Sequence, residues 1–516
     1  MCGIVGYIGD ENATGIIIDG LKKLEYRGYD SSGIALVTKD HQLIVRKKKG
    51  RIANLEELIA GEDLYANLGI GHTRWATHGA PSDVNAHPHT DMSGRIAVVH
   101  NGIVENYLAL KEWLIKEHNV VFKSETDTEI IAQLIGVLYD GDIEEAVRKA
   151  VEKMQGAYGI GVISRDEPDK MIAVRKDSPL IVGLGQGCNF IASDIPALLK
   201  YVRQIYLIEN NEMVVLTAND VKIYNADHEE VHRDVFNVTW DADAAEKEGY
   251  DHFMLKEIHE QPKGIRDTLV RRMDENGEIV LDGIKLTKED IEGFNKVYIV
   301  ACGTAYHAGL IGKFAIEKLA KISVEVDVAS EFRYRDPFID DKTLFIAISQ
   351  SGETLDTLAA LREAKAKGAR VLSVVNVVGS SVARESDDVF YTWAGPEIAV
   401  ASTKAYTTQL VCMYMLGLYM GRKKGIISDE VYKNYIDELL AVPDKLTSLL
   451  KQEKKIEALA KKLYKRNNVF FIGRGNDAAV AYEGSLKLKE ISYINSFAIA
   501  AGELKHGTIA LIEQDT

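Results

Sequence analysis

The sequence predicts an α+β domain followed by a duplicated α/β domain, and three observations support this fold class. Up to residue 238, short apolar segments bounded by turn residues outnumber long helical stretches, which is typical of a layered α+β domain. After Asn295, apolar segments alternate with helical patterns, as in βαβ units with a parallel sheet. The same opening of strand, glycine and helix follows Ala301 and again Gly473, which indicates a duplication.

The elements of the first domain follow from short apolar runs between turn signals. The expected strands are residues 3–8, 33–38, 95–100, 159–164, 171–175, 189–193 and 212–216. Two interleaved helices are expected over 11–24 and 127–137. Small and acidic residues at 239–250 predict a linker, so the first domain is expected to span 1–238.

The second part of the chain has the pattern of a parallel sheet. Its expected strands are residues 296–301, 343–348 and 371–375. A helix over 431–465 is expected to connect this domain, 251–428, to its second copy. That copy opens with a strand at 468–473 and a helix from Ala478. Within 429–516 we expect only part of a second α/β domain, because a parallel sheet needs more strands than this length provides.

Composition excludes several classes of function. The net charge of −15 argues against a general nucleic-acid binder or a protein of anionic membranes. The longest apolar stretch, 410–420, is too short to span a bilayer. The cysteines are far apart and form no CxxC pair, which predicts a reducing compartment, by default the cytoplasm. They are Cys2, Cys188, Cys302 and Cys412.

Neither a metal nor a cofactor is expected. Five histidines fall between residues 72 and 100, a density that suggests a metal site. The nearby carboxylates, Asp83 and Asp91, are not at ligand spacing on a helix, and no cysteine accompanies them. Structural histidines are therefore the preferred interpretation.

Cys2 is the strongest single indication of chemistry, because removal of Met1 would make it the N-terminal residue. A free α-amine has a pKa of about 8, close to that of a thiol, so it can take the thiol proton directly or through one water. The resulting thiolate is a strong nucleophile. The alternative is a small hydrophobic residue at the start of a strand.

Two polar segments contain groups that such a nucleophile needs. Arg74 is suited to a bidentate hydrogen bond with a carboxylate, and Thr77 and His78 are further donors. The alternative for this segment is a surface loop with a structural arginine. The Asn101 amide and the Gly102 N–H can form an oxyanion hole at a strand end. For this second pair the alternative is a hairpin turn, since Asn-Gly is a common turn dipeptide.

The segment 349–354, Ser-Gln-Ser-Gly-Glu-Thr, predicts a phosphate site in the second domain. It lies between a parallel strand and a helix, where free helix N–H groups and hydroxyls can cradle a phosphate. It lacks the lysine of a nucleotide-binding P-loop. Ordinary helix capping by a hydroxyl is the alternative.

Lys487 and Glu490 are three residues apart and share one face of an expected helix. A lysine and a glutamate directed into one pocket suit proton transfer next to a carbonyl. The alternative is a solvated ion pair. His506, in a following loop, can titrate near neutrality.

These segments together resemble the glutamine–fructose-6-phosphate aminotransferase (isomerizing) family. Residues 2–7, 26–31, 72–79, 100–102 and 124–129 resemble its class II glutaminase domain. Residues 349–354, 401–404 and 484–493 resemble its two sugar-isomerase domains. The resemblance implies a four-layer αββα N-terminal-nucleophile domain followed by two flavodoxin-like α/β domains, the second incomplete, and a homodimer without cofactors.

The resemblance also implies a role for each matching residue. Cys2 would be the nucleophile, and Asn101 and Gly102 would donate hydrogen bonds to the oxyanion. Glu490 would carry a proton between C1 and C2 of the sugar. Lys487 and a partner subunit's His506 would assist the opening of the sugar ring. The residues implied for glutamine are Arg74, Trp75, Thr77, His78, His87 and Asp127. Those implied for fructose 6-phosphate are Thr304, Ser349, Gln350, Ser351, Thr354, Val400 and Ser402.

Two departures from the family keep alternatives open. Ala305 stands where many relatives have serine, which removes one sugar contact. The family also continues for about 90 residues beyond this point, roughly the rest of an α/β domain, and carries a near-terminal lysine that forms an imine with the sugar. We therefore expect a truncated chain, and the alternatives are a glutaminase-only fragment, a sugar-phosphate sensor, or a class II glutaminase with another ammonia acceptor.

Overall fold

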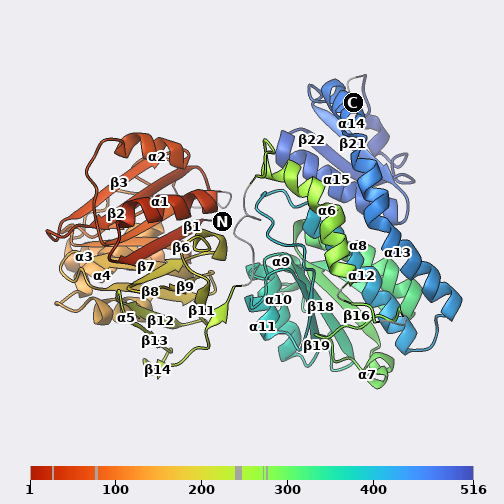
Figure 1. The fold of residues 1–516 in the computed structure, drawn as a ribbon, viewed down its shortest axis with the longest axis horizontal. Coiled ribbons are helices and arrows are strands. Elements are labelled where there is room, and N and C mark those ends of the chain that lie inside the picture. Colours follow the sequence, from red (N-terminus) through yellow and green to blue (C-terminus); the bar gives the residue numbers. More distant parts are fainter. Residues whose placement is uncertain are drawn as a thin grey trace. The chain divides into compact units, whose positions relative to one another are not determined.

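The computed structural model describes residues 2–25, 28–75, 79–238, 247–270, 272–274, 277–514 and 516. The chain divides into two compact units, Met1–Ala245 and Glu246–Thr516 (Figure 1). Residues 239–246 of the expected linker lie outside the described part of the chain. Each unit is built around its own sheets and is described by itself.

The first unit contains two antiparallel sheets. One has the order β15-β11-β9-β10-β1-β4-β2-β3 and the other β14-β13-β12-β8-β7-β6-β5. The strands of the first sheet are β1 (Gly3–Gly9), β2 (Ser31–Val37), β3 (Leu43–Lys49), β4 (Leu68–Arg74), β9 (Ile181–Leu184), β10 (Cys188–Ala192), β11 (Gln204–Leu207) and β15 (Phe236–Asn237). Those of the second are β5 (His89–Thr90), β6 (Ile96–Val104), β7 (Gly156–Ser164), β8 (Met171–Lys176), β12 (Glu212–Leu216), β13 (Val221–Tyr224) and β14 (Glu230–Val231).

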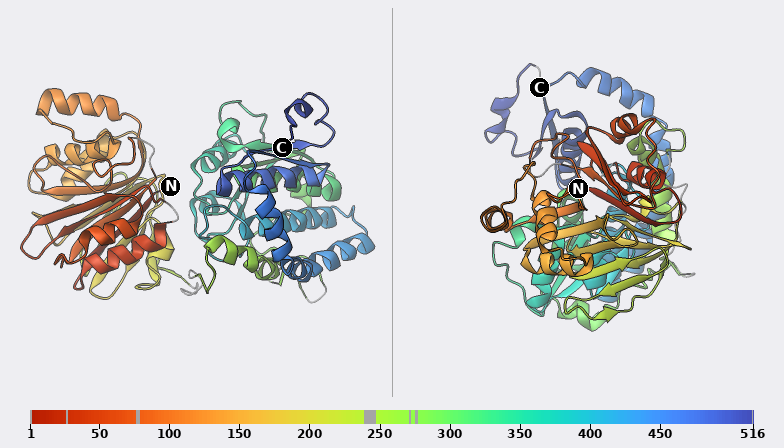
Figure 2. Two further views of the ribbon diagram at one scale, coloured as in Figure 1. Left: turned by 90° about the horizontal axis from the view of Figure 1, so that it is seen from above. Right: turned by 90° about the vertical axis from the view of Figure 1, so that its left-hand side faces the viewer.

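Helices cover the outer face of each sheet. They are α1 (Ala13–Leu24), α2 (Ile52–Ile59), α3 (Tyr107–His118), α4 (Asp127–Leu138) and α5 (Ile143–Lys153), and a 3₁₀ turn spans Ile195–Ala197. On β1, Val5 packs in the cluster with α1, whereas Ile4 packs in the core between the two sheets. On β6, Val98 packs in the cluster with α4, whereas Val99 faces the first sheet. The red α1 and the orange helices α3 and α4 thus lie on opposite sides of the strands (Figure 2), which confirms the expected αββα layers.

The second unit is built on one parallel sheet of order β17-β16-β18-β19-β20. Its strands are β16 (Lys296–Ala301), β17 (Ser323–Val328), β18 (Thr343–Ser349), β19 (Arg370–Val375) and β20 (Asp388–Tyr391). Its helices are α6 (Phe253–Val270), α7 (Lys288–Gly293), α8 (Gly303–Ala320), α9 (Ala329–Phe332), α10 (Leu355–Ala366), α11 (Ser381–Glu385) and α12 (Lys404–Lys423).

Successive residues of β16 show that this sheet is covered on both faces. Ile299 packs in the cluster formed with α8, α12 and α13 (Asp429–Leu450), and Val300 packs in the cluster formed with α9 and α10. Figure 1 shows α10 and α11 on one side of the strands and α8 and α12 on the other. Such sheets bind ligands where their strands end at the carboxyl edge.

The second copy follows as α14 (Glu453–Leu463), β21 (Asn468–Gly473), α15 (Asn476–Ser492), β22 (Asn495–Ala500) and a 3₁₀ turn at Thr508–Leu511. Strands β21 and β22 are parallel, and α15 packs on both of them and on α8. The single helix expected over 431–465 was wrong, because α13 and α14 are separate and Gln452 between them has a non-helical backbone. No helix of the described residues is long and apolar enough to cross a membrane.

Candidate active sites

Cys2 lies at the start of β1, directly beside the end of β4. Pairing of Gly3 with Thr73 places Cys2 opposite Arg74, and the backbone N–H of the following Trp75 donates to Cys2 Sγ over 3.2 Å. A side chain at Gly3 would bring its Cβ within 2.6 Å of Thr73 Oγ1, so the close approach needs glycine. Burial raises the pKa of the Cys2 thiol, opposed by the Trp75 hydrogen bond. The thiol therefore needs a base to become a nucleophile near neutral pH.

The Asn101 side chain contacts the same residue. Its Nδ2 donates to the backbone O of Cys2 over 3.1 Å, and its Oδ1 lies 2.9 Å from His72 Nε2. His72 Nε2 is also 3.1 Å from the backbone O of His100. Because both neighbours are acceptors, His72 Nε2 carries the proton and holds the amide with Nδ2 towards Cys2.

Gly102, next to Asn101, cannot be replaced without moving the strand. Its φ is +125°, and a Cβ would lie 2.0 Å from the backbone O of Ala157. The hairpin turn considered for this dipeptide is wrong, because both residues lie within β6 and pair with β7. The strand thereby presents Asn101 to Cys2 in a fixed register.

The residues expected to hold glutamine come from two places in the first unit. Arg74 is buried and donates from Nη2 to the backbone O of Gly79 over 2.9 Å. Asp127 begins α4 and accepts the Val104 N–H over 3.0 Å. Trp75 is 44% exposed, and its ring contacts Tyr29 edge-on. Thr77 and His78 lie outside the described residues.

Three of the clustered histidines form a buried core beside this site. The rings of His72 and His87 are 4.2 Å apart, and those of His87 and His89 are 5.1 Å apart. Burial lowers the pKa of His72 to about 3 and those of His87 and His89 well below their usual value. Within the described residues no group of three His, Cys, Asp or Glu side chains could hold a metal ion. These imidazoles are neutral packing and hydrogen-bonding groups.

This core predicts a loss of stability in mild acid. Below pH 6.5 the unfolded chain protonates His72 while the folded chain does not, so stability falls as the pH falls. From pH 7.5 to 5.0 the free energy of unfolding of the first unit should drop by about 2 kcal/mol from His72 alone. Urea unfolding at both pH values measures the drop. His72→Gln, which cannot titrate, should show a drop smaller by that amount, and equal drops would contradict the prediction.

In the second unit, the segment 349–354 forms a tight turn at the carboxyl end of β18. Ser349 Oγ accepts the Gly352 N–H over 3.0 Å and lies 3.0 Å from Thr354 Oγ1. Thr354 occupies the N-cap position of α10 but makes no side-chain capping hydrogen bond. The hydroxyls of Ser349 and Ser351 accept the N–H groups of Gly352 and Glu353 within the turn, so local capping accounts for the serines but not for Thr354. The first N–H groups of α10 have no partner within the helix and are directed towards its N-terminus.

A carboxylate that the sequence analysis did not select links α8 to α15. Glu483 is 5% exposed and accepts from Thr304 Oγ1 over 3.0 Å and contacts His307 Nδ1 at 2.7 Å. Lys487 Nζ lies 3.5 Å from Glu483 Oε1 and 2.5 Å from Glu490 Oε2. The structure thus brings Thr304, Lys487 and Glu490 together around Glu483. The i,i+4 spacing of Glu483 and Lys487 was the available sequence signal.

Val400 and Ser402 precede α12 in a segment without regular structure. Val400 is exposed, and Ser402 Oγ donates to Glu397 Oε2 over 2.7 Å. The backbone O of Gln350 accepts the Asn376 N–H. His506 is exposed in the turns after β22. The roles of these residues stay predictions.

Comparisons with known proteins match both units. The glutamine amidotransferase domain family matches residues 72–200, and the SIS domain family matches 291–419 and 462–516. The C-terminal domain of glucosamine-fructose-6-phosphate aminotransferase from Francisella tularensis superimposes with a TM-score of 0.50 at 44% identity, covering 52% of this chain and 75% of that one.

Curated relatives align along the whole chain. It is 60% identical over 516 residues to glutamine–fructose-6-phosphate aminotransferase (isomerizing) of Clostridium tetani, covering 100% of this chain and 84% of the relative. Over 514 residues it is 49% identical to the protein of that name from Thermus thermophilus, with the same coverage. At such identity over so much of both proteins, this chain belongs to the glutamine–fructose-6-phosphate aminotransferase (isomerizing) family.

Proposed function

We propose that this chain transfers the amide nitrogen of L-glutamine to D-fructose 6-phosphate and isomerises the product to D-glucosamine 6-phosphate, releasing L-glutamate. The observation that carries the proposal is the 60% identity to that family along all 516 residues, in a chain that sets Cys2 beside Asn101. We place the reaction in the cytoplasm of the cell, since four widely spaced cysteines without a CxxC pair fit a reducing compartment. We also propose that two copies of the chain form a homodimer.

The first half of the reaction takes place at Cys2. Once Met1 is removed, the Cys2 α-amine takes the thiol proton, and Sγ attacks the glutamine carboxamide. Asn101 Nδ2 has a second hydrogen besides the one on Cys2 O, and this hydrogen and the Gly102 N–H stabilise the oxyanion. The α-ammonium returns its proton to the leaving nitrogen, so collapse of the tetrahedral intermediate releases ammonia and leaves a γ-glutamyl thioester. Water then hydrolyses the thioester to glutamate and restores the thiol.

The two charged groups of glutamine, its α-carboxylate and its α-ammonium, are bound by side chains of opposite charge. Arg74 provides a guanidinium for the α-carboxylate, with Thr77 and His78 as further donors, and Asp127 pairs with the α-ammonium. Trp75 gates the passage of ammonia. His87 supports the loop of the first unit that closes over the glutamine site.

The second half takes place around the 349–354 turn. Ser349, Gln350, Ser351 and Thr354 hold the phosphate with the N-terminal N–H groups of α10. Thr304, Val400 and Ser402 contact the rest of the sugar. Ammonia condenses with the C2 carbonyl, and Glu490 removes a proton from C1 and returns it to C2. Lys487 and the partner subunit's His506 assist the opening of the sugar ring.

Gly352→Ala should damage this phosphate site selectively. The φ of Gly352 is +65°, and a Cβ would lie 2.0 Å from Ser380 Oγ, so the turn must shift. We expect KM for fructose 6-phosphate to rise about tenfold or more, because lost hydrogen bonds weaken ground-state binding. Steady-state kinetics measures it, with Gly293→Ala as the control, since a Cβ at Gly293 meets nothing within 4 Å. An unchanged KM in Gly352→Ala would exclude a role for the turn.

The proposed function is tested by quantifying both products separately. The purified chain is incubated with glutamine and fructose 6-phosphate, and glutamate and glucosamine 6-phosphate are measured by mass spectrometry. Equal amounts of both support the full reaction. Glutamate alone supports a glutaminase whose sugar site is inactive, and formation of neither contradicts the proposal.

A further inference from the structure

The segment 397–403, here called the α12 approach loop, carries Val400 and Ser402 and is held by a carboxylate at its end. Glu397 Oε1 accepts the N–H groups of Thr403 over 2.8 Å and of Ala405 over 3.0 Å. Its Oε2 accepts from Ser402 Oγ. An anion at a helix N-terminus is favourable, so Glu397 fastens the loop to the first turn of α12.

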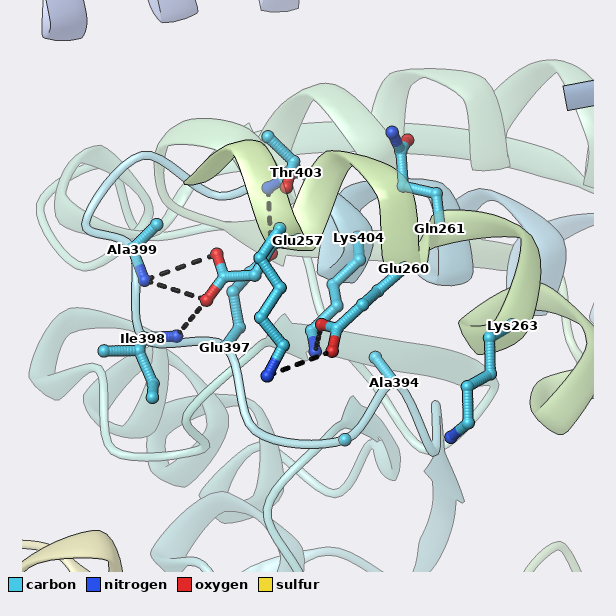
Figure 3. Close-up of polar contacts among 12 residues, drawn as sticks. Glu257, Glu260, Gln261, Lys263, Ala394, Glu397, Ile398, Ala399, Thr403 and Lys404 are labelled. Atoms are coloured by element: carbon cyan, nitrogen blue, oxygen red, sulfur yellow. Dashed lines mark hydrogen bonds and ion pairs between the residues drawn. The ribbon is translucent and has the colours of Figure 1, made fainter. Parts of the chain in front are cut away.

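A second carboxylate, on the helix α6, holds the start of the loop. Glu257 on α6 accepts the Ile398 N–H over 2.6 Å and the Ala399 N–H over 3.0 Å, both on Oε1 (Figure 3). Glu257 is 2% exposed, and Ile398 is 7% exposed. Water therefore cannot readily replace Glu257 as the acceptor for these amides. Val400 lies between the two attachments, and Ser402 is itself bonded to Glu397.

Beside Glu257, two lysines and two glutamates form a chain of ion pairs. Lys404 Nζ donates to Glu260 Oε2 over 2.6 Å, and Lys256 Nζ lies 3.5 Å from Glu260 Oε1 and 3.0 Å from Glu248 Oε1. Burial and the neighbouring Glu397 raise the pKa of Glu257 to about 7, while the two amides and Lys404 lower it. Both short hydrogen bonds end on one oxygen. Oε2, which accepts the Ala399 N–H over a longer 3.3 Å, can carry a proton without breaking these two bonds, so both bonds to Oε1 persist when Glu257 is neutral.

We propose that Glu257 is a positioning residue for the sugar-phosphate site: by binding the Ile398 and Ala399 amides, it fixes the α12 approach loop where Val400 and Ser402 meet fructose 6-phosphate. This inference rests on the proposed function for the identity of the sugar. Glu257 itself touches no reacting atom in this account. Loss of its oxygen weakens substrate and transition state alike, which raises KM and leaves kcat nearly unchanged.

The test compares three variants of the full chain. Glu257→Ala removes the acceptor, and we expect KM for fructose 6-phosphate to rise about 10- to 100-fold with kcat within about threefold. Glu257→Gln keeps one acceptor oxygen and should stay within about threefold of the parent KM. Asp267→Asn is the matched control, a carboxylate-to-amide change on the exposed part of α6 that affects only the ion pair with Lys263. Glutamine hydrolysis without sugar should be unchanged in all three.

Some outcomes would overturn the proposal. An unchanged KM in Glu257→Ala, or an equal rise in Glu257→Gln, would show that the acceptor oxygen does not position the loop. If Glu257→Ala does not fold, Glu257→Asp replaces it, because it withdraws the carboxylate by one methylene and keeps the charge. The same rise in KM is then expected.

A measurement independent of turnover separates this inference from the proposed function. Hydrogen exchange of the Ile398 and Ala399 amides should be at least about tenfold faster in Glu257→Asp than in the parent chain. Calorimetric titration with fructose 6-phosphate reports on the sugar site itself. A parent chain that does not bind fructose 6-phosphate would contradict the proposed function, whereas unchanged exchange in Glu257→Asp would contradict the positioning role.

Discussion

Cys2→Ser should abolish glutamine hydrolysis while leaving the sugar chemistry intact. Serine is small enough to keep Met1 removal, but its hydroxyl is far less acidic than a thiol, so the α-amine cannot generate a comparable nucleophile. We expect the rate of glutamate formation to fall by about a thousandfold or more. With ammonium salts in place of glutamine, the variant should still form glucosamine 6-phosphate, because the residues proposed for the sugar site belong to the second unit.

Cys188→Ser is the control for this experiment. Cys188 is a free, partly buried thiol on β10 in the same sheet as Cys2. It should keep the parent rate with either nitrogen source. A Cys2→Ser chain that still forms glutamate at the parent rate would show that another group is the nucleophile.

The second large effect is expected at Glu490. Glu490→Gln keeps the size of the side chain and a partner for Lys487 but cannot accept a proton from C1. Removal of a positioned acid–base group lowers a rate by about 10²- to 10⁴-fold, and we expect kcat for glucosamine 6-phosphate formation to fall within that range. Exchange of the C1 proton of fructose 6-phosphate with solvent, followed by NMR, should slow in parallel.

Glutamine hydrolysis measured without sugar provides the internal comparison. It should be unchanged in Glu490→Gln, since Cys2 lies in the other unit. Glu457→Gln, an exposed glutamate on α14 paired with Lys461, controls for the amide substitution. Parent rates of proton exchange in Glu490→Gln would assign the proton transfer to another residue.

The sequence predicted about half of the described strands, and it found these because their signals are local. Residues 296–301 and 468–473 coincide with β16 and β21, since apolar runs bounded by turn residues need no distant partner to be recognised. The helix α5 was missed although Asp142 caps it and its apolar residues recur at helical spacing. The helix α3 had little such signal, because only Leu110 and Leu114 of it are buried.

The residues of the candidate sites also fall into two groups, those that are close together in the sequence and those that are far apart. The turn 349–354 and the pair Lys487 and Glu490 are neighbours along the chain, so their chemistry is visible in the sequence. Glu257 and Glu483 act on groups about 140 and 180 residues away. No periodicity reports such contacts, because they depend on how helices pack across a sheet.

The hydrogen bond between Glu483 and α8 has a consequence for how the two copies of a duplicated domain can diverge. Two copies of one ancestral fold start out interchangeable, each able to lose parts that the other retains. Here one carboxylate of the later copy is the acceptor for Thr304 and the neighbour of His307 in the earlier copy, while its own helix presents Glu490. A substitution at Glu483 in the later repeat therefore changes the surroundings of Thr304 and His307 in the earlier one, and the reverse also holds. The two repeats thus share one cluster of side chains, and replacing either repeat alone would remove partners of the other.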